Sequence, residues 1–160
     1  MPKVVLGLLV VLVGGLAAFF VLRWLVERVS PTPSNLGVVD GRLAPCPNSP
    51  NCVSTLATDA EHGIAPIPYD GDTEAAHTAV LAILQSMPRV TIVTDEPTYI
   101  HAEARTAVWH FIDDVEFYFD AADGLIHFRS ASRLGYGDGG LNRQRMEEIR
   151  AAYASAGRME

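Results

Sequence analysis

The chain opens with an unbroken apolar stretch, after which apolar and polar residues follow one another in shorter patterns. Residues 4 to 22 carry no charged or strongly polar side chain, and Lys3 and Arg23 flank them. At about 1.5 Å of rise per residue, a helix of this length nearly crosses a hydrocarbon core of about 30 Å. The pattern predicts a membrane-spanning anchor within residues 1 to 29. A cleaved signal peptide is the alternative, although no small-residue cleavage motif follows the stretch.

The next stretch has no apolar periodicity. Residues 30 to 45 carry three prolines and two glycines, a composition typical of a linker that lifts a domain off the membrane. The remaining chain, residues 46 to 160, is long enough for one compact domain. Its first part, up to about residue 71, is expected to be irregular, with at most one short strand.

Apolar residues at helical spacing occur twice in the domain. Asp72 can cap a first helix that Pro88 ends, and Asn142 can cap a second helix that ends at Gly157. The apolar residues at this spacing are Ala76, Val80, Ile83, Leu84 and Met87 in the first helix and Met146, Ile149 and Tyr153 in the second. Each set forms one stripe, so both helices are expected to pack on a core.

Between these helices apolar residues alternate with polar ones, as they do in half-buried strands. Strands are predicted over about residues 90 to 94, 98 to 106, 109 to 120 and 125 to 133, with a hairpin signal at Asp123-Gly124. Sequential strands joined by tight turns form an antiparallel meander. The sequence therefore predicts an α+β domain, in which about four antiparallel strands carry two helices on one face, preceded by one N-terminal transmembrane helix.

Alternation divides the strands into an apolar and a polar face. The apolar face carries Ile100, Ala102, Ala104, Val115, Phe117, Phe119, Ile126, Phe128, Ser130 and Ser132, and the polar face carries His101, Glu103, Arg105, Asp114, Glu116, Tyr118, Asp120, His127, Arg129 and Arg133. The polar face is expected to contact solvent and to be held by cross-strand ion pairs. A two-residue turn would set Asp114 opposite Arg133, whereas a four-residue loop would set Glu116 opposite Arg129.

The net negative charge of the chain beyond residue 30 limits the kinds of molecule that it is expected to bind. Beyond residue 30 the chain holds 9 Arg, no Lys and 18 Asp or Glu. A surface with this excess of acid is a poor partner for nucleic acid and for anionic lipid, so no nucleic-acid partner is expected. The expected partners are the membrane, through residues 4 to 22, and a small anion or another protein.

Cys46 and Cys52 are the only cysteines, and they bound the segment CPNSPNC. The five-residue gap is wider than the usual spacing of paired zinc thiolates and differs from CxxC, so a structural disulfide is the leading prediction and a metal half-site or a redox couple the alternatives. A metal site would need His62, His101 or His110, which the spacing does not bring together, and no metal or cofactor is expected. A disulfide would place the domain on the extracytoplasmic side, periplasmic or outer, of the membrane.

The glycine-rich run GYGDGG, residues 135 to 140, leads from the last predicted strand into the last helix. It matches the GxGxxG pattern, but no strand follows that helix, so a dinucleotide-binding fold is not expected. Glycine-rich backbone at a helix N-terminus can bind anions. Arg143 and Arg145 lie in the first turn, where cations oppose the helix dipole, and they are therefore expected to face an acid or a bound anion.

These features favour the binding of a small anionic ligand or an acidic group of a partner. The predicted binding residues are Arg129, Arg133, Gly135, Asp138, Gly140, Asn142, Arg143 and Arg145. Alternatively, the glycines form only a tight turn and Asp138 neutralises the arginines. A hydrolase that uses Asp114, Glu116 or Asp138 is a second interpretation, although no catalytic constellation can be identified. A structural or interaction module in envelope assembly is the third.

Three motifs together carry a resemblance to a known family. CPNSPNCVS at 46 to 54, DDVEF at 113 to 117 and RSASRLGYGDGGLNR at 129 to 143 resemble the bacterial and plastid family catalogued as domain of unknown function 1499. The motifs span nearly all of the domain, and the membrane segment lies outside the resemblance. The resemblance implies no reaction, substrate or cofactor. Some relatives resemble proteins of the thylakoid lumen, which agrees with a disulfide outside the cytoplasm.

Overall fold

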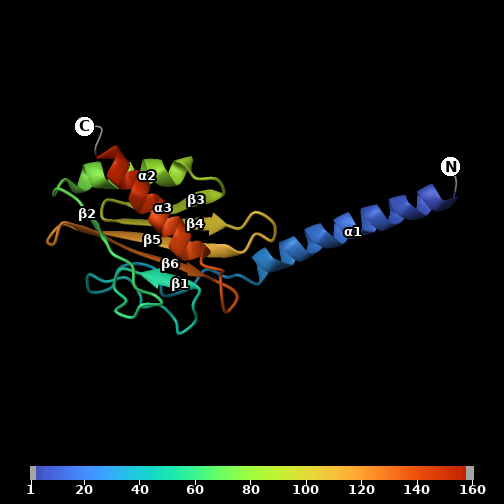
Figure 1. Cartoon of the computed structure of the whole chain (residues 1–160), viewed down its shortest axis with the longest axis horizontal. Helices are drawn as coiled ribbons and strands as arrows, with labels where there is room; N and C mark the ends of the chain where they lie inside the picture. Colours follow the sequence, from blue (N-terminus) through green and yellow to red (C-terminus); the bar gives the residue numbers. More distant parts are fainter. Residues whose placement is uncertain (1–2, 158–160) are drawn as a thin grey trace.

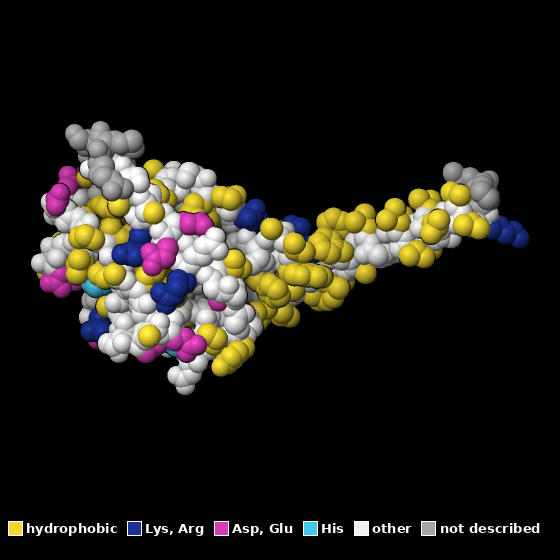
Figure 2. Space-filling view, viewed as in Figure 1, with side chains coloured by type: hydrophobic (Ala, Val, Ile, Leu, Met, Phe, Trp, Pro, Cys, Tyr) yellow, Lys and Arg dark blue, Asp and Glu magenta, His cyan; other side chains and the backbone are white. Residues whose placement is uncertain are grey.

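The computed structural model describes residues 3 to 157 and shows one long helix that extends away from a folded domain (Figure 1). This helix, α1 (Lys3–Arg28), buries none of its residues within the protein. By its length and composition α1 could cross a membrane, as the sequence predicts, and it is the one helix among the described residues that could. Figure 2 shows hydrophobic side chains along its whole length, up to the edge of the domain.

The domain is an antiparallel sheet with two helices on one face, which confirms the predicted α+β class (Figure 1). The strands are β1 (Cys52–Ser54), β2 (Ile67–Pro68), β3 (Val90–Glu96), β4 (Tyr99–Arg105), β5 (Ile112–Asp120) and β6 (Leu125–Ser132), and the helices are α2 (Thr73–Ser86) and α3 (Leu141–Ala156). The sheet order is β1-β6-β5-β4-β3, and β2 also pairs with β6. The six strands exceed the expected four because β1 and β2 are too short to produce an alternating pattern in the sequence.

The core lies between the sheet and the two helices, on the face that alternation predicts to be apolar. Its largest fully buried side chains include Phe117 and Phe119 from β5, Phe128 from β6 and Met146 from α3. Glu116 of β5 pairs with Arg129 of β6, which is the register of the four-residue loop. The predicted division of the strands into two faces is therefore confirmed.

The two domain helices begin in different ways. Asp72 caps α2 as predicted, since its side chain accepts a hydrogen bond from the Ala75 amide. The prediction that Asn142 caps α3 is wrong, because the helix begins one residue earlier and Gly140, at φ 83°, occupies the cap position. The Asn142 side chain is buried in the domain, where it donates to the carbonyl of Asn51 and is unable to cap the helix.

The centre of the polar face is buried, because His101, Asp114, Glu116 and Arg129 are each at most 5% exposed, so the expectation that this face contacts solvent is wrong there. Residues 30 to 43 run along this face, on the side of the sheet away from α2 and α3 (Figure 1). The Ser30 carbonyl accepts a hydrogen bond from Arg133, and the Gly37 amide donates to Glu116. Ser30 and Leu43 are themselves buried. The segment predicted as a linker is thus packed on the domain, largely through backbone groups that leave no periodic signal in its side chains.

Candidate functional site

In the glycine-rich loop before α3, backbone amides point at a carboxylate of the chain itself, the side chain of Asp138. Gly135 and Gly140 adopt positive φ, at 90° and 83°, which lets the loop turn back on the helix. The Asp138 carboxylate accepts hydrogen bonds from the Gly140 amide at 2.9 Å and from the Asn142 amide at 2.7 Å. Asp138 therefore supplies the negative charge at the positive end of α3.

The two first-turn arginines also have partners within the protein. Arg145 donates to Asp113 at 2.6 Å and to the Asn142 side chain at 2.8 Å. Arg143 donates to the backbone carbonyls of Glu61 at 2.9 Å and Gly63 at 3.0 Å. The sequence prediction that these cations face an acid or an anion holds for Arg145, whose acid is Asp113. Arg143 instead fastens the loop of residues 59 to 63 to α3.

The eight predicted binding residues do not form one site. Arg129 and Arg133 project from the polar face of β6 and from the residue just beyond it, where their partners are Glu116 and Asp114. Asn142 and Arg145 lie on the opposite face, below α3. The sheet separates the two pairs of residues, so the structure does not bring the four together around one ligand.

The first of two charge networks on the polar face centres on Asp114 of β5. Arg133 contacts both carboxylate oxygens, at 2.9 and 2.7 Å, and His101 Nε2 lies 2.8 Å from Oδ1. Arg133 also pairs with Glu103, which pairs in turn with Arg105. Burial disfavours the charged form of Asp114, but Arg133 and His101 outweigh burial and hold the pKa of this carboxyl below its ordinary value. Asp114 is therefore an ionised partner that orients His101, and it is unsuited to acting as a general acid.

The second network centres on Glu116, a fully buried carboxylate. It accepts hydrogen bonds from Arg129 at 3.1 Å, from the Tyr99 hydroxyl at 2.9 Å and from the Gly37 amide at 2.8 Å. Burial, together with the negative charge of Glu116, raises the pKa of Tyr99, so the phenol stays protonated and donates. Because Gly37 belongs to the segment after α1, this network ties that segment to the middle of the sheet.

The segment of residues 32 to 38 and the strands β3 and β4 line an open groove of about 500 Å³ beside His101 and Tyr99. Its lining includes Thr32, Leu36, Gly37, Tyr99, His101 and Tyr118. His101 is only 3% exposed, yet it contributes to this lining while Asp114 fixes its Nε2. The alternation of the strands alone predicts that His101 is exposed to solvent. The signal that could have identified it is the gathering of acids, histidine and arginine at one parity on three consecutive strands.

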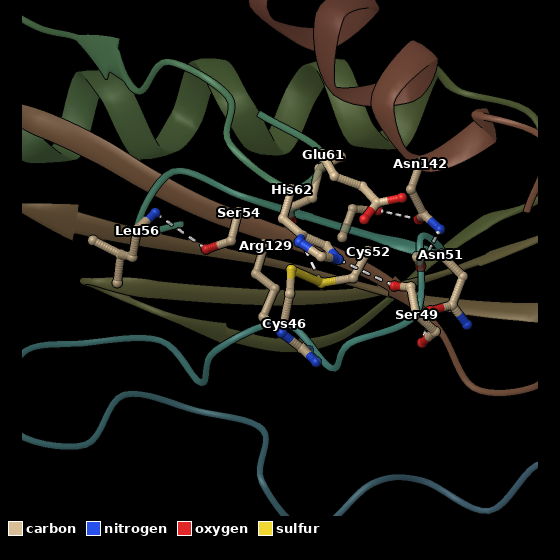
Figure 3. Close-up of a disulfide and its surroundings, with 12 residues drawn as sticks. Cys46, Ser49, Asn51, Cys52, Ser54, Leu56, Glu61, His62, Arg129 and Asn142 are labelled. Atoms are coloured by element: carbon tan, nitrogen blue, oxygen red, sulfur yellow. Dashed lines mark hydrogen bonds between the residues drawn. A yellow bond between two sulfur atoms is a disulfide. The ribbon is translucent and has the colours of Figure 1, made fainter. Parts of the chain in front are cut away.

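Cys46 and Cys52 form the predicted disulfide, which joins the glycine-rich loop through the residues around it (Figure 3). Asn51 Nδ2 donates to the Gly135 carbonyl at 2.8 Å. His62 contacts the Ser49 carbonyl within the ring, as Figure 3 shows. The disulfide uses both thiols, and within residues 3 to 157 no group of three His, Cys, Asp or Glu side chains is placed to hold a metal ion. The cysteine motif and the glycine motif therefore form one structural unit at one end of the sheet.

A family model described as a protein of unknown function, DUF1499, matches residues 42–153. The chain belongs to this family. The DUF1499 region takes in the disulfide, the side chains of both charge networks and most of α3. It begins after α1 and after Gly37, whose amide donates to Glu116. No curated protein and no solved structure matches the chain. Membership of DUF1499 therefore identifies the domain but assigns it no activity.

Proposed function

We propose that this chain is a single-pass membrane protein whose DUF1499 domain lies on the extracytoplasmic side and binds a small polar ligand, hydroxylated or acidic. The binding surface is the groove between residues 32 to 38 and the strands β3 and β4. The observation that carries the proposal is His101, a buried imidazole that Asp114 orients and that lines this groove. A hollow with a few fixed polar groups is the usual form of a small-molecule site.

Two features support the membrane location and its sidedness. The apolar part of α1, residues 4 to 22, has the length and hydropathy of a membrane span. The Cys46–Cys52 disulfide favours an oxidising compartment, because cytosolic thiols are kept reduced. Both features agree with a domain held outside the cytoplasm by an uncleaved anchor.

The contacts of the carboxylates favour binding over hydrolysis. Asp114 and Glu116 are each held by an arginine, and Asp138 is held by two backbone amides. An acid–base catalyst needs a carboxyl or imidazole that exchanges protons with a substrate or a water. These three carboxylates instead hold cations and backbone in place, while the hydroxyl and imidazole groups of the groove can form hydrogen bonds with a ligand.

The proposal is tested by a thermal-shift panel on the full chain in detergent micelles. The panel contains phosphates, carboxylates, sugar acids and polyols, each measured with the wild type, His101→Gln, His127→Gln and Arg143→Ala. His127 is the matched control, because it lies on the same face but bonds to Thr55 outside the groove. A ligand at about one hundred times its dissociation constant adds about 2.7 kcal/mol to the stability of the folded state.

We expect at least one compound to raise the melting temperature of the wild type and of His127→Gln but not of His101→Gln. A shift that only Arg143→Ala removes would contradict the groove and move the site to the start of α3, where the sequence predicts an anion. The absence of a shift with every compound would contradict small-ligand binding and favour a structural or interaction module.

A further inference from the structure

The loop that connects β4 to β5 displays three large apolar side chains. Val108 is 55% exposed, Trp109 is 42% exposed and Phe111 is 37% exposed. The loop has a fixed shape, because the Thr106 amide donates to the Phe111 carbonyl and the Phe111 amide donates to the Thr106 hydroxyl, both at 3.0 Å. Exposed apolar side chains on an ordered loop commonly mark a contact with another surface.

This loop lies against α1. The rings of Trp109 and Phe19 have their centroids 5.6 Å apart. One residue further along the loop, His110 Nδ1 lies 2.7 Å from the carboxylate of Glu27. Hydrophobic side chains are therefore continuous from α1 to the edge of the domain, where Figure 2 shows them gathered.

The two contacts place the loop at a definite height along α1. Phe19 precedes Arg23 by four residues and Glu27 follows it by four, so each lies about 6 Å from Arg23 along the helix axis. Arg23 ends the apolar stretch, so in the proposed membrane-spanning anchor it marks the level of the lipid headgroups. Trp109 then lies just inside the hydrocarbon boundary and His110 lies just outside it, the order that interfacial tryptophan and polar residues adopt in membranes.

We propose that residues 106 to 111 are a second membrane contact, which lies in the interfacial layer of the bilayer beside α1. This inference rests on the proposed membrane anchoring of α1. A lipid surface is the occupant that the observations favour, because the patch continues the apolar surface of α1 and contains no acidic or basic residue other than His110. An interfacial loop and a spanning helix together hold the domain in one orientation relative to the membrane.

The chain offers a direct test, since it contains two tryptophans, Trp24 in α1 and Trp109 in the loop. The variants Trp109→Phe and Trp24→Phe each leave one tryptophan, and both replaced side chains are partly exposed and substituted by another aromatic ring. The full-length variants are reconstituted in phosphatidylcholine vesicles whose acyl chains carry bromine at defined depths. Quenching of tryptophan fluorescence by the bromine then reports whether each ring contacts lipid.

We expect the shallowest bromine to quench both single-tryptophan proteins most strongly, with at least a twofold loss of fluorescence for Trp109. Quenching of Trp24 without quenching of Trp109 would overturn the loop contact and leave the anchor intact. The absence of quenching in both proteins would overturn the anchor, and the loop contact with it. Strong quenching of Trp109 by a water-soluble quencher such as acrylamide, at the level of free tryptophan, would also contradict the loop contact.

Discussion

At the scale of single residues, His62 is held in an environment that favours its charged form. Its Nδ1 lies 2.8 Å from the Asp59 carboxylate and its Nε2 lies 3.2 Å from the Ser49 carbonyl. Both partners are acceptors, so both ring nitrogens can donate only when the ring is protonated. Burial opposes the charge, but the bonds to Asp59 and Ser49 outweigh it and raise the pKa of His62 above its ordinary value of 6.5.

The raised pKa of His62 predicts a loss of stability on the alkaline side. A group whose pKa is raised by folding contributes its full stabilisation below the unfolded value, here 6.5, and loses it as the pH rises through the folded value. We expect the wild type to be more stable than His62→Gln below pH 6.5 and to lose this advantage as the pH rises. Urea unfolding of both proteins across this range measures the difference. A difference that does not change with pH would contradict the assignment.

The buried ion pair of Asp114 and Arg133 should contribute strongly to the stability of the folded domain. Replacing it with asparagine leaves Arg133 without its principal partner in a buried site, so we expect Asp114→Asn to cost about 3 to 5 kcal/mol at neutral pH. The matched control is Asp95→Asn, where a half-exposed carboxylate faces His77 and the loss should stay below about 1 kcal/mol. Urea unfolding gives both values. Equal small losses in the two variants would show that the network does not hold the sheet.

Asp114 should also make the stability of the folded protein depend on pH in the acidic range. Because the pKa of Asp114 is lowered in the folded protein, its contribution is present above the unfolded value of 3.8 and is lost as the pH falls through the lower folded value. The stability gap between the wild type and Asp114→Asn should therefore narrow below pH 3.8. A gap that persists at the lowest pH at which both proteins fold would contradict the shift.

At the scale of elements, the start of α3 depends on Asp138. Replacing a capping side chain with alanine costs about 0.5 to 2 kcal/mol, and we expect Asp138→Ala and the benchmark Asp72→Ala to fall in this range. Without its internal carboxylate the backbone amides before α3 become free to bind an external anion. Inorganic phosphate should then stabilise Asp138→Ala more than it stabilises the wild type. Equal stabilisation of both proteins by phosphate would show that Asp138 does not fill this position.

Some helices and strands can be predicted from the pattern of apolar residues in the sequence, and others cannot. Periodicity is sufficient to predict α2, α3 and the two faces of the strands, because these elements bury regular stripes of apolar side chains. It does not predict β1 and β2, which are two or three residues long, or the covering of the polar face by residues 30 to 43. That covering depends on backbone groups of Ser30 and Gly37. Backbone groups are the same in nearly every residue, so their contacts cannot be recognised from the sequence.

The residues of the groove are equally hard to recognise from the sequence. The sequence drew attention to Arg143 and Arg145 because their place in a helix is unfavourable, and the structure shows them bonded to Asp113 and to loop carbonyls. His101 has an unremarkable place in a strand and becomes notable only when the segment after α1 covers it. Tertiary packing therefore decides which residues line the groove, and the local sequence pattern does not reveal it.

At the scale of the whole molecule, the proposed sidedness predicts the behaviour of fusion proteins in a bacterial host. Alkaline phosphatase fused after Glu160 should be active, because it folds only outside the cytoplasm, and green fluorescent protein at the same place should be dark. Replacing both Cys46 and Cys52 with serine is the control, since it removes the disulfide and should leave the topology unchanged. If the green fluorescent protein fusion is fluorescent and the alkaline phosphatase fusion is inactive, the domain lies in the cytoplasm and the proposed sidedness is wrong.

In the proposed site, His101 lies under the segment after α1, is fixed by Asp114 and contacts a ligand in the groove. Nuclear magnetic resonance of the ring N–H groups tests it directly in ¹⁵N-histidine-labelled protein. We expect a slowly exchanging Nε2–H signal that disappears in His101→Gln and that moves when the compound identified by the thermal-shift panel is added. A signal that exchanges rapidly with water, or that stays in place while the ligand binds, would contradict the account.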